Sequence, residues 1–217
     1  MAEVLSYPDL AARAAALQLE VLGGFACAGE AGFPAGTQVL VLLGPLQPGF
    51  WPVVTAAPEW GGPDPVDRWS RRVVGKLACD LGAKALFPFG GPPWQPFHAW
   101  ALRTGRVWES PVRLLVHETQ GLMVSFRGAL ALKEPVELPL AAVSPCVGCS
   151  RPCLTACPVG ALSGAGYDLA ACHGYLDGEG QESCMAAGCL ARRACPVSAR
   201  HARMAEQSAY HMRQFHR

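Results

Sequence analysis

The sequence predicts a mixed α+β protein in two parts, and three features of its 217 residues carry that prediction. Apolar residues recur at helical spacing in two early segments, whereas a third early segment is continuously apolar over the length of one strand. Eight of the ten cysteines fall between Cys146 and Cys195, in a region that is poor in large aliphatic residues. Because 51% of the residues are hydrophobic and only 16% are charged, the composition argues against an intrinsically disordered chain.

The first predicted element is a helix near the N-terminus. Gly23 and Gly24 are expected to end it, because glycine favours the end of a helix. Residues 38–43 (QVLVLL) then form a continuous apolar run, which is typical of a strand covered on both faces. The helix is expected to bury side chains that recur every three or four residues: Leu10, Ala14, Leu17 and Val21.

A second helix is predicted to begin at Asp64 and Pro65, a capping residue followed by a proline in the first turn. Asp67 is favourably placed in that first turn, where a negative charge is stabilised by the helix dipole. Gly82 is expected to stop the helix. Its buried stripe would comprise Val66, Trp69, Val73, Leu77 and Leu81.

Residues 87–97 (FPFGGPPWQPF) are not expected to form a regular element, because they contain four prolines and two glycines. A short helix is expected over residues 98–103. Three strands are predicted after it, over residues 112–117, 122–127 and 129–133, with turns at Gln120-Gly121 and Gly128. The predicted helices come early in residues 1–143 and the predicted hairpins come late. This order predicts an α+β layer around one sheet for residues 1–143.

Residues 144–217 are predicted to form a small metal-binding domain with a C-terminal helical tail. Few large aliphatic residues are available for a core there, so bound metal would supply part of the folding free energy. The first cysteine block, Cys146-x2-Cys149-x3-Cys153-x3-Cys157-Pro158, differs by one inserted residue from the C-x2-C-x2-C-x3-C-P run of two-cluster ferredoxins. The second block ends at Cys195 in the same Cys-Pro-Val as the first.

Two Cys-Pro endings favour two [4Fe–4S] clusters whose fourth ligands are exchanged between the blocks. Cluster one would be bound by Cys146, Cys149, Cys153 and Cys195, and cluster two by Cys157, Cys172, Cys184 and Cys189. Cys27 and Cys79 are expected to be buried apolar residues. The alternatives are one cluster with spare cysteines, or structural zinc, although zinc prefers two C-x2-C knuckles and the cluster region contains one. Disulfides are disfavoured because they belong to exported proteins.

Charge and hydropathy disfavour several classes of partner. The formal net charge of +1 gives no electrostatic reason to expect nucleic acid or an anionic membrane surface. The longest strongly apolar stretch, residues 39–46, is too short to span a bilayer. The N-terminal residues lack the basic and apolar regions of a signal peptide. We therefore expect a cytoplasmic protein with no nucleic-acid or membrane partner.

The cysteine region resembles a known family. Residues 146–162 (CVGCSRPCLTACPVGAL), 166–176 (GYDLAACHGYL) and 182–197 (ESCMAAGCLARRACPV) are similar to the ferredoxin-like half of cobalamin-dependent epoxyqueuosine reductases and reductive dehalogenases. Residues 103–132 are similar to the strand–turn–strand that precedes the clusters in that family. Residues 64–77 (DPVDRWSRRVVGKL) and the QVLVLL run resemble cobalamin-processing proteins of nitroreductase-like fold. The resemblance implies a nitroreductase-like domain over residues 1–143 and a ferredoxin-like domain with two [4Fe–4S] clusters over residues 144–217.

The same resemblance implies a relay of single electrons through two clusters, from a donor of flavoprotein or ferredoxin-reductase type to an acceptor at the first domain. A corrinoid is the implied acceptor, which would make the protein a cobalamin-related reductase. No residue matches the catalytic acid of the family, so no catalytic residue is assigned. The loop at residues 87–97 is the candidate wall of a ligand pocket, with Phe89, Trp94, Phe97, His98 and His117 as its candidate residues.

The alternative is a plain ferredoxin-type electron carrier that docks a partner enzyme and holds no small-molecule substrate. A filled core behind the loop at residues 87–97 would favour this carrier. A pocket large enough for a tetrapyrrole would favour the reductase.

Overall fold

The computed structural model describes residues 5–216, and the chain divides into two compact units. The first unit extends up to Arg106 and also includes Ser125–Ala141. The second comprises Val107–Val124 and the chain from Ala142 onward. The sequence placed a boundary near residue 143, next to the second crossing, but assigned residues 107–124 to the first domain. Helices together with antiparallel sheets confirm the mixed α+β class.

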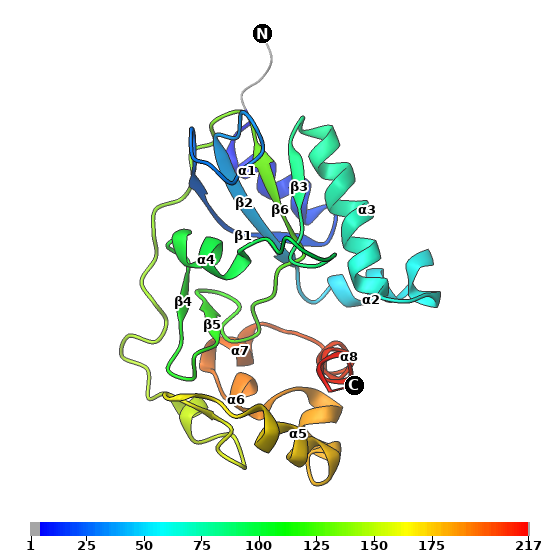
Figure 1. Cartoon of the computed structure of the whole chain (residues 1–217), viewed down its shortest axis with the longest axis vertical. Helices are drawn as coiled ribbons and strands as arrows, with labels where there is room; N and C mark the ends of the chain where they lie inside the picture. The colour runs from blue at the N-terminus through cyan, green and yellow to red at the C-terminus, as the bar shows by residue number, and fades with distance from the viewer. Residues whose placement is uncertain (1–4, 217) are drawn as a thin grey trace. The chain divides into compact units, whose positions relative to one another are not determined.

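A four-stranded antiparallel sheet forms the centre of the first unit (Figure 1). Its strand order is β1-β2-β6-β3, so β6 lies between two strands that precede it in the chain. All seven residues of β2 are buried, as its continuous apolar run predicts. The strands are β1 (Leu19–Ala26), β2 (Val39–Pro45), β3 (Lys84–Leu86) and β6 (Gly128–Leu132).

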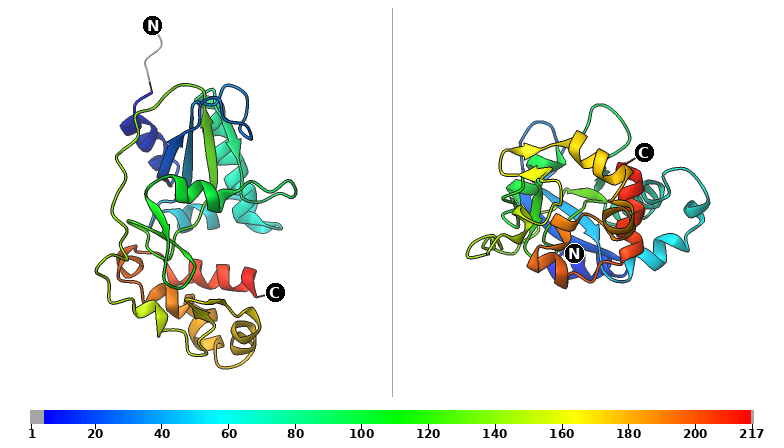
Figure 2. Two further views of the ribbon diagram at one scale, coloured as in Figure 1. Left: turned by 60° about the vertical axis from the view of Figure 1, so that its left-hand side comes forward. Right: turned by 90° about the horizontal axis from the view of Figure 1, so that it is seen from below.

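Helices cover this sheet on both sides. Helix α3 packs against β3 and β6, and α1 packs against β1, so the sheet lies between the two helices (Figure 2). The predicted start of α3 is confirmed, with Pro65 in its first turn and Trp69 buried against Phe50 at a ring distance of 5.2 Å. The helical elements are α1 (Tyr7–Ala15), α2 (Phe50–Thr55), the 3₁₀ turn η1 (Pro58–Gly61), α3 (Pro65–Asp80) and α4 (Phe97–Arg103).

The helix predicted through Val21 is wrong beyond its first half. Helix α1 ends at Ala15, and β1 follows as the antiparallel partner of β2. Gly23 and Gly24 lie where the register between β1 and β2 shifts, rather than at a helix end. A Cβ at Gly23 would lie 2.8 Å from the Cβ of Thr104, so this glycine permits a close approach of the chain. Backbone pairing with β2 outweighs the helical spacing of the apolar side chains.

The three late strands are confirmed only in part. The run at residues 129–133 forms β6, but Gly128 begins that strand and is not a turn. Only β5 (Leu115–His117) forms within residues 112–117, and it pairs with β4 (Val107–Glu109), which the sequence did not predict. Residues 122–127 form no strand, because the N–H groups of Met123 and Val124 close turns onto Gln120 and Gly121 and that of Leu122 bonds to the Ser198 side chain.

The second unit combines the β4–β5 hairpin with short helices and turns. Its apolar core is small, and Cys153 and Cys195 are buried within it beside Val116 and Leu122. The remaining elements are η2 (Pro152–Leu154), β7 (Leu162–Ser163), β8 (Gly166–Tyr167), α5 (Leu169–Asp177), the π-helical turn η3 (Gln181–Met185), α6 (Leu190–Arg193), α7 (Pro196–Arg200) and α8 (Ala205–Phe215). Between residues 5 and 216, no helix has the length and apolar character needed to cross a membrane.

The turn that follows β5 contacts the cysteine region at Gly121. This glycine has a φ of +58°, and a Cβ there would lie 2.5 Å from the backbone nitrogen of Ser198 and 3.1 Å from the Sγ of Cys195. The neighbouring Leu122 N–H donates to the Ser198 Oγ at 2.8 Å. This turn therefore approaches the residues around Cys195 more closely than a side chain at position 121 would allow.

Replacing Leu42, which is fully buried in the central strand, tests the core of the first unit. We expect Leu42→Ala to lower the free energy of unfolding by about 2–5 kcal/mol, because it removes buried methyl groups and leaves a cavity. Leu140→Ala is the matched control, since Leu140 is 91% exposed, and it should change stability by about 0.5 kcal/mol or less. Urea unfolding followed by tryptophan fluorescence reports on this unit, which contains five of the six tryptophans. Equal effects of both substitutions would contradict the assignment of the core.

Gly121→Ala tests the contact between the hairpin and Cys195. The substitution should destabilise the second unit by about 1–3 kcal/mol beyond the cost of a left-handed alanine, because of the steric overlap with Ser198. Gly160→Ala is the control, because Gly160 has a φ of +63° and its Cβ would meet no atom within 4 Å. The readout is the rate of tryptic cleavage at the arginines after residue 190. Equal rates for the two variants would argue against the close approach.

Candidate metal centre

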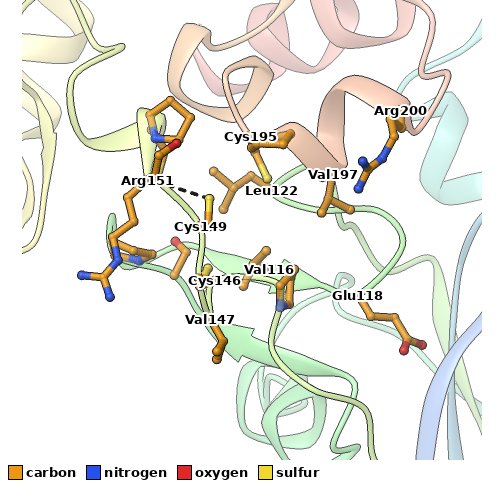
Figure 3. Close-up of a pocket in the computed structure, with 18 residues that line it drawn as sticks. Val116, Glu118, Leu122, Cys146, Val147, Cys149, Arg151, Cys195, Val197 and Arg200 are labelled. Atoms are coloured by element: carbon orange, nitrogen blue, oxygen red, sulfur yellow. Dashed lines mark hydrogen bonds between the residues drawn. The ribbon is translucent and has the colours of Figure 1, made fainter.

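A cavity of about 430 Å³ in the second unit is lined by four cysteines (Figure 3). Three of them come from the loop around η2, and the fourth directly precedes α7. Both cysteine blocks therefore contribute to one cavity. The four are Cys146, Cys149, Cys153 and Cys195, the set that the sequence assigned to cluster one.

Burial and neighbouring thiolates raise the pKa of two of these thiols, Cys146 and Cys153. Burial raises the pKa of Cys146, and the thiolates of Cys149 and Cys195 raise it further. The pKa of Cys153 is also raised, first by burial and then by the neighbouring thiolates of Cys146 and Cys195. Ionising several thiols here is costly unless a cation takes up their charge, and metal ligation requires the thiolate form. The donor set and its surroundings fit a cationic metal centre.

Cys195 differs from Cys146 and Cys153. Burial alone raises its pKa, but hydrogen bonds to the thiolate outweigh burial and leave the pKa lowered. The donors are the backbone N–H groups of Ser198, Leu122 and Val197 and the hydroxyl of Ser198. The hairpin thus supplies one of the donors to this cysteine, through Leu122. The sequence analysis did not identify these donors, because they depend on the contact at Gly121.

Ser110 adds a further polar group to the cavity wall. Its side chain is 5% exposed, and its Oγ has no hydrogen-bond partner among residues 5–216. A buried hydroxyl without a partner is costly, so its presence beside four thiols fits an acceptor bound in the cavity. Sulfur atoms of an iron–sulfur cluster would accept such a hydrogen bond. The sequence analysis did not identify Ser110, which lies between the helix predicted over residues 98–103 and the strand predicted over residues 112–117.

The other four cysteines of the region also lie near one another. Burial raises the pKa of Cys172, and the thiolates of Cys189 and Cys157 add to this effect. Burial likewise raises the pKa of Cys184, with further contributions from Cys189 and Cys172. Cys172 lies on α5, Cys184 on η3, and Cys189 immediately before α6. These are the four residues that the sequence assigned to cluster two.

The two groups exchange their last cysteines between the two sequence blocks, which is the arrangement expected from the Cys-Pro at the end of each block. Each group contains three cysteines of one block and the last cysteine of the other: Cys195 joins the first group and Cys157 the second. In the described part of the chain, no three His, Cys, Asp or Glu side chains are arranged to hold a single metal ion. Thiolates around a four-iron cluster each bind a different iron atom and are spaced more widely than those around one ion. Their role as cluster ligands stays a prediction.

The two cysteines outside the region lie in the first unit. Cys27 is buried as expected, and burial raises the pKa of its thiol. Cys79 is exposed, so the expectation that it is buried is wrong. The buried face of α3 comprises Val66, Trp69, Ser70, Val73, Val74, Leu77 and Ala78, and Cys79 lies outside it. All ten cysteines are free.

Two arginines flank the first group of cysteines. Arg151 and Arg200 both line the cavity, and the guanidinium of Arg151 points away from the sulfur atoms (Figure 3). The positive charge of Arg151 lowers the pKa of Cys146, although burial dominates. By contrast, residues 152–191, which hold the second group, contain four acidic side chains and no lysine or arginine. Glu118 also lines the first cavity, and the positive charge of Arg192 acts on Tyr167 beside Cys172, so the difference in charge between the two groups is small.

The candidate ligand-pocket residues are not gathered in this cavity. Phe97 is buried against Trp100, at 5.1 Å between ring centroids, and against Phe126 at 6.1 Å. Phe89 packs on Phe87 and lies under the guanidinium of Arg71. Trp94 and His98 are exposed, and His117 is buried in the second unit, where its Nδ1 accepts backbone hydrogen bonds. Their role in binding a ligand stays a prediction.

Comparisons with known proteins add no relative. No known protein family, no curated protein and no solved structure matches this chain. The function is therefore argued from the cysteine geometry and from the motifs of the sequence.

Proposed function

We propose that the second unit binds two [4Fe–4S] clusters and that the protein relays single electrons between a donor and an acceptor. One observation carries the proposal: eight cysteines form two groups of four, and each group takes its fourth member from the other block. Such exchanged ligation is the pattern of two-cluster ferredoxins. As part of this proposal, we place the protein in the cytoplasm, where free thiols persist.

Bound clusters would supply one-electron chemistry, and the residues around them would set its energetics. The backbone N–H groups that face the sulfur of Cys195, together with the hydroxyl of Ser198, stabilise negative charge on this sulfur. Val116 and Leu122 exclude water from one side of the cavity, and Val147 forms part of its outer wall. Hydrogen bonds, burial and nearby charge are the means by which a protein tunes such a centre.

The segments around the two groups of cysteines predict unequal reduction potentials. Arg151 and Arg200 beside the first group favour its reduced, more negative state. The segment of the second group contains four exposed acidic residues, which disfavour the reduced state of the second cluster. They are Asp168, Asp177, Glu179 and Glu182. Solvent screens exposed charges, so this difference is modest. The second cluster would have the lower reduction potential, so electrons would pass from the second cluster to the first.

The acceptor has two candidates of different class. The packing of Phe97 against Trp100 and Phe126 is the filled core that favours a plain electron carrier docking a partner protein. Reduction of a corrinoid is supported by the resemblance of the cysteine motifs to cobalamin-dependent reductases. In both cases a flavoprotein or a ferredoxin reductase is the class of donor that we propose.

Metal analysis of anaerobically purified protein tests the proposal directly. We expect about eight iron and about eight acid-labile sulfide per chain, with a brown visible spectrum. About four of each would mean that one group binds no cluster. Zinc without iron would overturn the redox proposal.

Cysteine substitutions test the grouping. Cys157→Ser should lose about half of the iron, because it removes a ligand of the second cluster. Cys79→Ser is the matched control, because Cys79 is exposed on α3 in the first unit and should leave the iron content unchanged. Loss of iron in Cys79→Ser would show that the ligand sets are wrong.

Titration with hydroxocobalamin separates the two acceptors. A corrinoid-reducing protein with full clusters should shift the visible bands of the corrinoid, with saturation near one equivalent, and should retain it through dialysis. A plain carrier should leave the bands unchanged and lose the corrinoid on dialysis. The second result would eliminate the corrinoid while leaving the electron relay intact.

A further inference from the structure

We propose that Tyr167 tunes the second cluster by donating a hydrogen bond to Cys172, and that Phe215 at the end of α8 holds Tyr167 in place. This inference rests on the proposed function, because it assigns a role toward a bound cluster. Three contacts within the second unit carry it. They are a hydroxyl–sulfur hydrogen bond, a stack of aromatic rings and a set of contacts at the C-terminal end of α8.

The hydrogen bond joins β8 to α5. The Tyr167 hydroxyl donates to the Sγ of Cys172 at 3.2 Å, within the range of hydrogen bonds to sulfur. An ordinary phenol is protonated at neutral pH, so the Tyr167 hydroxyl is available as a donor. A five-residue separation, across the start of α5, brings the two side chains together.

Phe215 holds the ring of Tyr167. Tyr167 belongs to a strand of only two residues and is 38% exposed, so its own element fixes its side chain weakly. The Phe215 ring stacks on Tyr167, with centroids 6.1 Å apart and planes within 13°. It also stacks on His173, at 4.8 Å. Phe215 therefore bridges Tyr167 and the residue that follows Cys172.

Further contacts fix α8 in the position that this stack requires. The Nε2 of His216 pairs with Asp177 Oδ1 at 2.9 Å, and its Nδ1 contacts that of His173. Near the start of α8, a Cβ on Gly188 would lie 2.7 Å from the Cβ of Ser208, so the helix packs tightly on the segment of the second cysteine group. The buried residues of α8 are Gln207, Ser208 and Ala209, and Phe215 is 39% exposed.

The physical effect of the hydrogen bond has a definite sign. Reduction adds negative charge to the cluster and its thiolates, and a donor to a thiolate stabilises that charge. The Tyr167 hydroxyl therefore raises the potential of the second cluster and partly offsets its acidic surroundings. Removing the hydroxyl should lower that potential.

Tyr167→Phe tests this directly in the full-length protein with both clusters. In a redox titration followed by electron paramagnetic resonance, we expect one of the two midpoint potentials to become more negative while the other stays unchanged. Iron content should stay the same as in the wild type. The matched control is Tyr7→Phe, which removes a hydroxyl from α1 in the first unit and should shift neither potential. Unchanged potentials in Tyr167→Phe with full iron would overturn the inference.

A second measurement avoids any loss of folding in that variant. Replacement of all tyrosines by 3-fluorotyrosine makes each phenol a stronger donor, so the same potential should move in the positive direction. The shift should be absent when residue 167 is phenylalanine. No shift on fluorination would overturn the role of Tyr167 even if Tyr167→Phe fails to bind iron.

Variants of Phe215 test the support for the ring. Phe215→Ala should reproduce part of the negative shift, and Phe215→Tyr, which keeps the stack, should restore the wild-type potential. Equal potentials in Phe215→Ala and the wild type would remove Phe215 from the proposal. Wild-type protein without iron would instead overturn the proposed function, so the two failures are distinguishable.

Discussion

The second unit depends on the exchange of Cys157 and Cys195 between the two cysteine blocks. Each block alone offers three cysteines to a group, and the fourth arrives from the other end of the domain. Two of the eight, Cys153 and Cys195, also belong to an apolar core that is small for the length of chain it supports. Under the proposed function, ligation and packing would be two aspects of the same contacts, since the free energy of metal binding would also be free energy of folding.

The β4–β5 hairpin extends this dependence to a segment far away in the sequence. The turn that follows β5 reaches the residues after Cys195 at Gly121, and the N–H of Leu122 in this turn donates to that thiolate. A second hydrogen bond joins the same two segments, because the Arg192 guanidinium donates to the Leu122 carbonyl at 3.2 Å. The hairpin thus belongs to the cysteine domain in its contacts, although it lies between two segments of the first unit in the chain.

Local sequence rules identified the elements whose signals are local. Helix α3 has a first-turn proline and an apolar stripe, and β2 has a continuous apolar run, so both were predictable, although Asp64 makes no capping hydrogen bond with its side chain. The grouping of the cysteines followed from the repeated Cys-Pro ending. Strand β1 was mistaken for helix because its pairing with β2 is non-local. The turn at Gly121 was predicted from the sequence, but its contact with Ser198 was not. Ser110 and Tyr167 gave no usable signal, since each acts through a residue that is brought near only by the folded chain.

The strand order of the first unit imposes a sequence of events on synthesis. Strand β6 lies between β2 and β3, yet it leaves the ribosome after the hairpin of the second unit. The first sheet can be completed as soon as residue 132 is available, because domains generally fold as units during synthesis. The hairpin must then wait for more than sixty further residues, until Cys195 emerges. During that interval Val112, Val116 and Leu122 lack the residues that bury them in the folded unit, so the nascent chain exposes an apolar segment of the kind that chaperones bind.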